Sequence, residues 1–403
     1  MQVQIWFLIY TCVAALEAEH ELYSEHGDGN LWLAKRGVPV KNTLPVVPIR
    51  NTKNGYTADV FVGTPPQPVT LLLNTDFADS FLIQQGTTSG FLNRGSVSGT
   101  TYFNKGASSS WGSNGTSYSY SYESGSVKGD WGTDVFTVGN VSAKHFSVGV
   151  ASSVRGVSSG VLGLGREEQQ SGYQSGTVYN GLTQQMKQEG AIKSSSFSFN
   201  LNDRYDPFGT LILGGLDHSK YTGRLASLPF ASNDRISAEV QGVYTTGREK
   251  DNSLTSPAAG VIGLGSPLSY FPGGLLVNIR TALNANPSFA IGERYYCDCN
   301  ITQSLVLDFG PVRVNVPAYE FLWPMTDITN QFSENLFFPQ KSCYLAIEES
   351  KDDEIVLGEN ILRSMYTVVN YETNQVAIAQ ANGNRNASPN IEAISGTIIP
   401  GAS

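Results

Sequence analysis

Two loops of this chain could bring chemically active side chains together, because each follows an apolar run that reads as a buried strand. The first loop, residues 74–76, reads Asn-Thr-Asp and comes directly after three leucines. The second loop, residues 263–265, reads Gly-Leu-Gly and follows a Val-Ile pair. A buried strand that ends in a turn often delivers that turn to a functional surface. The first loop supplies an amide, a hydroxyl and one carboxylate, whereas the second supplies no polar side chain.

Two facing carboxylates would give such a pair of loops hydrolytic chemistry. The ionised member takes a proton from water, while the protonated member polarises the carbonyl under attack. Asn74 has nearly the shape of Asp, but its amide is not a base, and Gly263 has no side chain. Asp76 could enter the cleft as a single acid, or it could be a turn residue that hydrogen-bonds its own backbone. The residues themselves therefore predict a site without a carboxylate pair.

The segments around these loops read as the strands and turns that would position them. Residues 56–70 give a strand, a Gly/Pro turn and the start of a second strand. Tyr118, Tyr120 and Tyr122 alternate with serines before a Gly/Ser turn, which predicts a β-hairpin. Five further segments read as strands or as apolar runs interrupted by glycine. We call these segments and the ones above sequence blocks; the five lie at 160–165, 197–202, 209–216, 259–272 and 355–371.

In this order, the blocks resemble the pepsin-like aspartic peptidases across roughly residues 44–381. The resemblance implies an all-β, bilobal pepsin-like acid protease fold with a cleft between two pseudo-symmetric β lobes. The expected N-terminal lobe with its flap spans 44–203, the C-terminal lobe 204–380, and a tail 381–403. The length of 403 residues also favours two lobes, because it exceeds what one core usually holds.

The family has Asp-Thr-Gly at the first loop and Asp-Ser/Thr-Gly at the second. The resemblance therefore equates its catalytic dyad with Asn74 and Gly263, so no intact catalytic residue is expected. Glu123 stands near the hairpin tip where the family usually has Gly. The side chains that the resemblance implies along or beside the peptide-binding cleft are Tyr122, Thr75, Asp76, Phe81 and Leu264.

The two loops also differ from the family at the positions whose side chains connect one loop to the other. There, Thr/Ser hydroxyls hydrogen-bond across the lobe interface; here Thr75 is retained, but Leu264 replaces its counterpart. We expect an apolar contact at Leu264 and a backbone or water partner for the Thr75 hydroxyl. Phe77 and Pro267 replace small hydroxyl residues, which indicates a cleft floor adapted to packing.

Residues 160–165 and 260–265 are nearly identical and differ only by Leu162 against Ile262. They are either a duplicated element or a similarity that arose after the second loop lost its catalytic residue. The segment that follows, Leu-Ser-Tyr-Phe-Pro at 268–272, belongs with the second catalytic loop of the family. We therefore favour the second interpretation.

The composition restricts the partners. Charged residues make up 15% of the chain and hydrophobic residues 40%, and the net charge is -9 with a pI near 5.0. This acidity argues against nucleic acid and anionic membranes as partners. No metal site or other cofactor is expected, because the histidines at His20, His26, His145 and His218 are isolated or near the N-terminus.

Residues 1–18 look like a secretory signal peptide, with an apolar stretch and small residues near its end. Lys35 and Arg36 would end a short propeptide at 19–36, or they are an ordinary pair of surface charges. No other stretch is long enough to span a membrane, so we expect a secreted, extracellular monomer. Sequons for N-glycosylation stand at Asn114, Asn140, Asn300 and Asn386.

Four cysteines are present, and Cys12 would leave with the signal peptide. Cys297, Cys299 and Cys343 remain, an odd set, so in an oxidising compartment one pair should form and one thiol is left over. The resemblance implies a disulfide between Cys299 and Cys343. Pairing through Cys297 stays open as an alternative.

We therefore expect a catalytically inactive aspartic-peptidase-like protein, a pseudopeptidase, that binds a peptide or protein in its cleft by strand-like hydrogen bonds. Two alternatives stay open. One is an aspartic endopeptidase with an atypical site, which acid-pH cleavage of an unstructured protein would reveal. The other is a secreted inhibitor or decoy that acts through surface loops such as 88–114, which mutation of that loop against Tyr122 would separate from cleft binding.

Overall fold

The computed structural model describes residues 44–52, 54–87, 101–121, 125–248, 250, 254, 256–288, 294–325 and 341–403. Strands dominate these residues, as the sequence predicts, and the α-helices are short: α3 (Leu182–Gln188), α4 (Gly273–Ala282), α5 (Ala318–Phe321) and α7 (Glu359–Leu362). The expected signal peptide at 1–18 and propeptide at 19–36 lie outside the described residues, as do Tyr122 and Glu123. None of the helices in the described ranges combines the length and the apolar character needed to cross a bilayer.

Eight strands build the N-terminal half: β1 (Val46–Thr52), β2 (Gly55–Val62), β3 (Gln67–Asn74), β4 (Phe81–Ile83), β5 (Gly112–Ser121), β6 (Ser126–Val138), β7 (Val141–Arg155) and β8 (Gly160–Gly163). Their side chains follow the two-residue period of strands with one buried face. In β2, for example, Ala58, Val60 and Val62 are buried while the residues between them keep more exposure.

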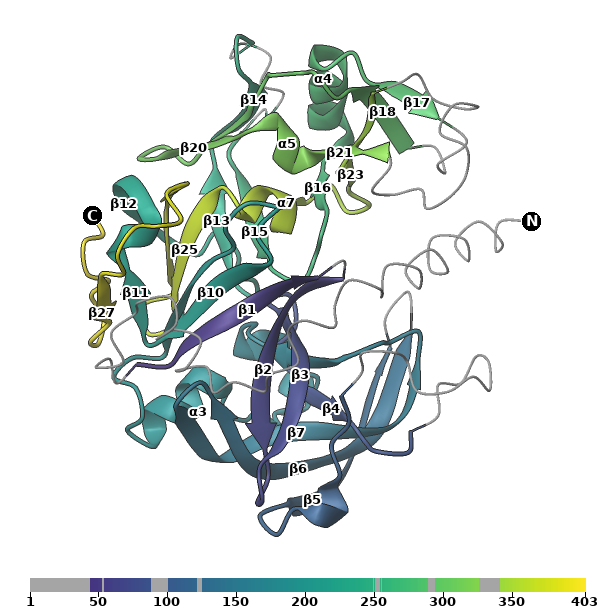
Figure 1. Cartoon of the computed structure of the whole chain (residues 1–403), viewed down its shortest axis with the longest axis vertical. Coiled ribbons are helices and arrows are strands. Elements are labelled where there is room, and N and C mark those ends of the chain that lie inside the picture. The colour runs from purple at the N-terminus through teal and green to yellow at the C-terminus, as the bar shows by residue number, and fades with distance from the viewer. Residues whose placement is uncertain are drawn as a thin grey trace.

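Further strands join the halves or build the C-terminal half: β9 (Ser196–Asn200), β10 (Phe208–Leu213), β11 (Gly215–Asp217), β12 (Tyr221–Pro229), β13 (Ser237–Val240), β14 (Gly242–Thr245), β15 (Ala258–Gly263), β16 (Ser269–Phe271), β17 (Asn286–Ser288), β18 (Arg294–Asp298), β19 (Leu305–Asp308), β20 (Arg313–Val316), β21 (Leu322–Pro324), β22 (Ser342–Leu345), β23 (Ile347–Glu349), β24 (Ile355–Gly358), β25 (Met365–Asn370), β26 (Gln375–Ala381) and β27 (Ile391–Ala393). Figure 1 shows most of the C-terminal half, in teal, green and yellow, above the purple and blue N-terminal half.

One sheet of 13 strands ties the molecule together, in the order β12-β26-β25-β9-β10-β1-β2-β3-β8-β4-β7-β6-β5. Strands from the beginning, middle and end of the chain are neighbours in it, and β1, β10 and β25 lie between the two halves in Figure 1. A single apolar cluster, which includes Leu73, Leu213 and Ile262, continues from one half into the other. The prediction of an all-β, bilobal fold is confirmed.

The segment expected as a tail is folded onto the rest of the protein. Its strand β27 pairs with β11, and Ile394 and Ile399 are buried in a small apolar cluster. The Ser403 N–H donates to the carbonyl of Leu225 at 3.1 Å. Residues 381–403 therefore pack as part of the C-terminal half.

Each half repeats one arrangement of four strands. In the N-terminal half, β3 pairs in parallel with β8, β8 pairs antiparallel with β4, and β4 pairs in parallel with β7. In the C-terminal half, β15, β24, β16 and β23 pair in the same three ways. This pseudo-symmetry makes β15 the counterpart of β3, and the two loops of interest follow these two strands.

Two buried carboxylates, Glu320 and Glu359, interact electrostatically with the guanidinium of Arg363 near the junction of the halves. Arg363 Nη1 lies 3.4 Å from Glu320 Oε2. Glu359 Oε1 accepts N–H groups from Tyr56 in β2 at 3.3 Å and from Gly265 in the second loop at 3.1 Å. Burial raises the pKa of both Glu320 and Glu359 to about 7, although Arg363 opposes the rise. Glu359 therefore connects the N-terminal half to the second loop.

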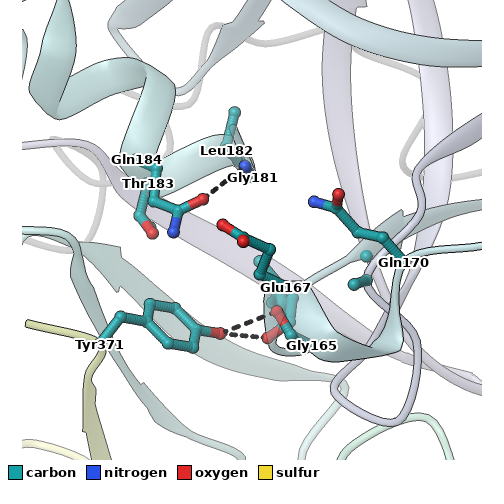
Figure 2. Close-up of a pocket in the computed structure, with 11 residues that line it drawn as sticks. Gly165, Glu167, Gln170, Gly181, Leu182, Thr183, Gln184 and Tyr371 are labelled. Carbon is teal, nitrogen blue, oxygen red and sulfur yellow. Dashed lines mark hydrogen bonds between the residues drawn. The ribbon is translucent and has the colours of Figure 1, made fainter. Parts of the chain in front are cut away.

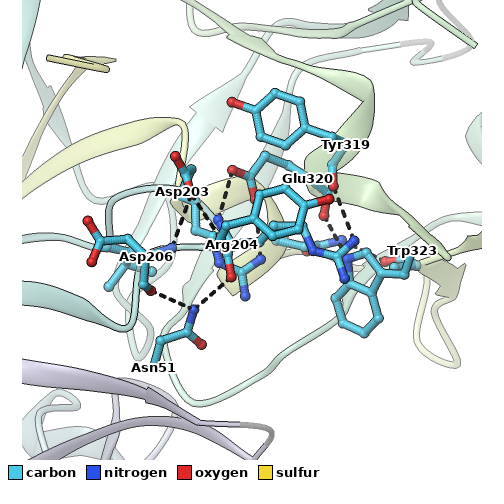
Figure 3. Close-up of polar contacts among 12 residues, drawn as sticks. Asn51, Asp203, Arg204, Asp206, Tyr319, Glu320 and Trp323 are labelled. Atoms are coloured by element: carbon cyan, nitrogen blue, oxygen red, sulfur yellow. Dashed lines mark hydrogen bonds and ion pairs between the residues drawn. The ribbon is translucent and has the colours of Figure 1, made fainter. Parts of the chain in front are cut away.

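Contacts with the chain between β9 and β10 support this cluster (Figure 3). The Arg204 N–H donates to Glu320 Oε1 at 3.3 Å, and Arg204 Nη1 donates to the carbonyl of Tyr319 at 3.4 Å. Asn51 of β1 donates through Nδ2 to the carbonyls of Arg204 and Asp206, both at 3.3 Å. Elements of both halves thus hold the buried carboxylates in place.

We predict that folding stability rises as the pH falls from about 8 to about 5. The folded-state pKa of about 7 at Glu320 and Glu359 lies above the ordinary value of 4.5. Their contribution is therefore complete below about pH 4.5 and is lost as the pH rises through 7. Each proton taken up on folding contributes about 1.4 kcal/mol per pH unit within this window. Glu320→Gln should flatten the pH dependence measured by urea unfolding.

The matched control is Glu239→Gln, which changes an exposed carboxyl in β13 and should leave the slope of stability against pH unchanged. If wild type and Glu320→Gln show equal slopes, the buried cluster does not cause the pH dependence.

Candidate functional site

The two loops meet through hydrogen bonds between Thr75 and Leu264. The Thr75 N–H donates to the Leu264 carbonyl at 2.9 Å, and the Leu264 N–H donates to Thr75 Oγ1 at 2.9 Å. The Thr75 hydroxyl donates to the carbonyl of Ile262. Both side chains are buried, and Leu264 packs in the apolar core. The expected backbone partner for Thr75 and the expected apolar contact for Leu264 are both present.

A glycine crosses behind each loop in the same way. The Gly163 N–H donates to Ser80 Oγ at 3.0 Å, and the Gly358 N–H donates to Ser269 Oγ at 2.9 Å. A Cβ atom on Gly358 would stand only 2.0 Å from the carbonyl oxygen of Leu268. Backbone passes so close to backbone here that only glycine fits.

Strand register matches the two loops position by position. Asn74, the last residue of β3, lies opposite Gly163, and Gly263, the last residue of β15, lies opposite Gly358. Asn74 and Gly263 are therefore structural equivalents. By the same alignment of the two loops, Asp76 is equivalent to Gly265. Of the two loops, the N-terminal one carries the polar side chains Asn74, Thr75 and Asp76, whereas the second carries none.

The similar sequences 160–165 and 260–265 occupy different places in the fold. The first forms β8 and its continuation, whereas the second forms the end of β15, whose counterpart is β3. The similarity therefore does not reflect one element repeated in two halves, in agreement with the interpretation favoured from the sequence.

Gly265 brings the second loop against Asn74. Its φ is 102°, and a Cβ atom there would lie 2.7 Å from the carbonyl oxygen of Leu73 and 3.0 Å from Asn74 Cγ. Because both the conformation and the space exclude a side chain, glycine is required. Asn74 Oδ1 accepts the N–H of Asp76 at 2.8 Å, so this amide oxygen stabilises its own loop.

An ion pair between the two halves holds the Asp76 carboxylate. Arg235, just before β13, donates through Nη2 to Asp76 Oδ1 at 3.0 Å, and its Nη1 lies 3.5 Å from Glu354 Oε2. The side chains of Arg235 and Asp76 keep 27% and 26% of their surface exposed, so the pair is partly shielded from water. Burial raises the pKa of Asp76, and Arg235 counteracts this rise.

Asp76 therefore belongs to a carboxylate–guanidinium pair. Its Oδ2 lies 3.4 Å from the point where a Cβ atom on Gly263 would stand. The carboxylate thus faces the position at which the second loop has no side chain. Sequence reasoning did not select Arg235, because its partner lies 159 residues away and nothing in the local pattern marks it.

The hairpin predicted from alternating tyrosines is formed by β5 and β6. Tyr118 is buried with its ring 4.9 Å from that of Trp131. The half-buried ring of Tyr120 packs edge-on against Phe77 of the first loop at 4.4 Å. The hairpin therefore covers part of this loop, while the position of Tyr122, the predicted flap tyrosine, lies outside the described residues.

Asp79 anchors the chain three residues after the first loop. It is fully buried and accepts hydrogen bonds from the Tyr179 hydroxyl and, at 3.1 Å, from the Ser171 N–H. Burial and the adjacent Asp79 carboxylate both raise the pKa of Tyr179. These partners give Asp79 a structural role.

Three residues predicted to line or border the cleft have no accessible side-chain surface to offer a ligand. Thr75, Phe81 and Leu264 are 1%, 0% and 0% exposed. Phe81 packs near the ring of Tyr118, so its prediction as a ligand contact is corrected to a core role. Of the predicted residues that the structure describes, Asp76 keeps exposed surface.

A small pocket is lined by Ala78, by the end of β8 and the residues after it, by the start of α3 and by Tyr371 (Figure 2). The Tyr371 hydroxyl donates to the carbonyl of Leu164 beside it, and the Gly181 N–H donates to Gln184 Oε1 at 2.8 Å. These groups satisfy local backbone rather than converge on a ligand. Across the described side chains, no group of three or more His, Cys, Asp or Glu could hold a metal ion.

Comparison with known proteins agrees with this architecture. A family model described as eukaryotic aspartyl protease matches residues 55–381. The chain belongs to the eukaryotic aspartyl protease family. The match covers both loops and the strands β3, β8, β15 and β24 that position them.

Relatives of this aspartyl protease family member are found in several fungi. The chain is 27% identical to Aspartic proteinase 3 of Saccharomyces cerevisiae, over 87% of this chain and 74% of that protein. It is 28% identical to a probable aspartic-type endopeptidase, opsB, of Aspergillus fumigatus, over 92% of this chain and 77% of that protein. It is 27% identical to Secreted aspartic protease 3 of Candida albicans, over 85% of this chain and 83% of that protein.

Among solved structures, the aspartic proteinase from Irpex lacteus superposes with a TM-score of 0.69 at 20% identity. The superposition covers 86% of this chain and all of that one. At this identity the likeness shows the fold. It agrees with the two-lobed β architecture seen here. Within this chain, a disulfide joins Cys299 and Cys343 as expected and leaves Cys297 as a buried thiol.

We predict that Thr75→Val destabilises the protein by about 1–3 kcal/mol, because it removes the acceptor of the Leu264 N–H and leaves a buried donor unsatisfied. Urea unfolding at neutral pH measures this loss. Thr222→Val, at an exposed position in β12, is the control and should change stability little. An equal loss in both variants would show that the cross-loop hydrogen bonds do not cause the effect.

We predict that Arg235→Met destabilises the protein by about 1–2 kcal/mol at pH 7, less than loss of a partner from a fully buried pair. The reason is that Asp76 stays partly shielded without its counter-ion. The effect should shrink at about pH 3, where a protonated Asp76 needs no cation.

Asp76→Asn in the Arg235→Met background is the control, because it removes the unpaired charge and should recover stability at pH 7. A loss that stays constant from pH 7 to pH 3 would rule out the ion pair as its source.

Proposed function

We propose that this family member is a pseudopeptidase, which binds a peptide or protein in the cleft between its lobes and does not hydrolyse it. The observation that carries the proposal is the placement of Asn74 and Gly263 at equivalent positions on the two facing loops. We assign them to the positions of the family's catalytic dyad. An amide and an absent side chain cannot share the proton that the two-carboxylate mechanism requires.

Asp76 does not restore a dyad. Its equivalent in the second loop is Gly265, where the approach of Asn74 leaves no space for a side chain. Its partner is instead Arg235, at 3.0 Å. A guanidinium stays charged at every working pH, so it is neither a base for water nor a useful proton donor. This arrangement counts against an active endopeptidase with an atypical site.

The retained framework supports ligand binding. The β5–β6 hairpin lies over the first loop, with Tyr120 packed on Phe77. An extended peptide between such a hairpin and the loops would bind mainly through its backbone, as added strands do. We assign ligand contacts to Tyr122, which follows β5 in the sequence, and to the exposed part of Asp76.

We also propose that the protein is a secreted, extracellular glycoprotein that acts as a monomer, with residues 1–18 removed as a signal peptide. The disulfide fits an oxidising compartment, and a Candida albicans relative is named a secreted aspartic protease. The four sequon asparagines are exposed, as glycan attachment requires: Asn114, Asn140, Asn300 and Asn386.

Hydrolysis of denatured casein between pH 3 and pH 6, with and without a statine-type inhibitor, tests the proposal. Loss of positioned acid–base groups commonly lowers rates by about 10² to 10⁴, and loss of both carboxylates removes the mechanism. We expect no inhibitor-sensitive cleavage by wild-type protein whose folding is verified by circular dichroism. Inhibitor-sensitive cleavage that disappears in Asp76→Ala would overturn the proposal.

A restored variant provides the matched control. It combines Asn74→Asp, Asp76→Gly and Gly263→Asp with Val356→Ala, because a Cβ atom on Gly263 would stand 2.9 Å from Val356 Cγ1. This variant should gain inhibitor-sensitive cleavage in the same assay. Once a ligand is known, Tyr122→Ala should weaken its binding, whereas substitutions in 88–114 should not; the reverse would favour the inhibitor or decoy alternative.

A further inference from the structure

We propose that the disulfide of this protein is exchangeable: Cys297 can replace Cys299 as the partner of Cys343. The exchange would turn Cys299 into a free thiol and so create a modification site in the C-terminal half, away from the two loops. The proposal stands on the placement of three cysteines in one small sheet and is independent of the function proposed above.

Strand register places the free thiol beside the bridge. Cys297 in β18 lies directly opposite Cys343 in β22. Directly opposed residues in antiparallel strands have Cα atoms roughly 4.5–5.5 Å apart, which is inside the range of about 4.4–6.8 Å that disulfides span. The existing bridge from Cys299 to Cys343 has a Cα–Cα distance of 5.0 Å. Both pairings therefore satisfy the backbone spacing of a disulfide.

All three side chains leave the sheet on the same face. Cys299 follows the last residue of β18 and is bonded to Cys343, so these two side chains lie on the same side of the sheet. The ladder continues past the end of β18, because the Cys299 N–H donates to the Lys341 carbonyl at 2.9 Å. Cys343 pairs with Cys297 and therefore shares its face.

The exchange needs no external oxidant or reductant. The Cys297 thiol loses its proton, and its sulfur attacks Cys343 Sγ. A bond forms between Cys297 and Cys343 while the bond between Cys299 and Cys343 breaks, and the departing Cys299 thiolate takes up a proton. One disulfide and one thiol are present before and after, so electrons and atoms balance.

The surroundings of Cys297 determine how fast this occurs. Burial raises the pKa of the Cys297 thiol to about 12, and the neighbouring carboxylate of Asp298 adds to the rise. Arg294, on the same strand, is paired with Glu348 at 2.8 Å, whose carboxylate also accepts the hydroxyl of Tyr344 on the adjacent strand. Because the thiolate is the attacking species, exchange should be slow at neutral pH and faster under alkaline conditions.

The exchange changes the solvent exposure of the free thiol. Cys297 is 4% exposed, whereas Cys299 lies at a partly exposed position just beyond β18. In the present pairing the free thiol is buried, and in the alternative pairing it reaches solvent. The two isomers therefore differ in whether a small thiol-directed reagent can modify the folded protein.

The experiment locates the free thiol in the folded, wild-type chain after incubation at pH 7 and at pH 9. Samples are quenched with acid, unfolded and labelled with N-ethylmaleimide, and tandem mass spectrometry assigns the label to Cys297 or Cys299. We expect label on Cys299 to increase with time, about tenfold faster per pH unit. Label confined to Cys297 after prolonged incubation at pH 9 would overturn the proposal.

Two single variants test the alternative bridge directly. Cys299→Ser should form a disulfide between Cys297 and Cys343 and contain no free thiol. Cys297→Ser is the matched control, which should keep the present bridge and show no labelling at either pH. A folded Cys299→Ser protein with two free thiols would contradict the proposal, and if this variant does not fold, the wild-type labelling alone decides.

Discussion

The hydrogen bonds between Thr75 and Leu264 fix the arrangement on which the rest of the site depends. They join the two halves where both loops end, and they involve the backbone of each loop as well as one hydroxyl. Behind each loop, a glycine crosses at a distance that no side chain would allow. These constraints concern backbone contact, so they persist whether or not the loops carry catalytic side chains.

Charged groups add a second set of connections between the halves. Arg235 reaches the first loop through Asp76, and Glu359 binds amides of both Tyr56 and Gly265. Removing charges from water is costly, so each shielded carboxylate here has a cation or N–H donors as partners. Polar groups of both halves therefore meet at the centre of the molecule. They are an ion pair and carboxylate–amide hydrogen bonds, and not two facing carboxylates. The ion pair between Asp76 and Arg235 ties the halves together, and the Asp76 carboxylate faces the position of Gly263.

The success of sequence reasoning depended on how local each signal is. Alternating tyrosines predicted the β5–β6 hairpin, and the apolar runs before Asn74 and Gly263 predicted the ends of β3 and β15, because strand periodicity is written in neighbouring residues. The disulfide partners of Cys343 were narrowed to two, and the structure selects Cys299. Phe81 was misjudged as a ligand contact, since sequence position beside a loop does not reveal which way a side chain points.

The sequence, through its strand patterns and its resemblance to the pepsin-like aspartic peptidases, predicted the all-β, two-lobed fold, and it determined the residue types in both loops, including the amide at Asn74 and the missing side chain at Gly263. Only the tertiary structure decided that Asp76 pairs with Arg235, that Leu264 supplies backbone groups to Thr75, and that Cys297 lies opposite Cys343. The physical reason is the sequence separation of the residues that interact. Strand patterns arise from contacts along the chain, whereas these pairings join residues brought together by packing of the two halves or by strand register.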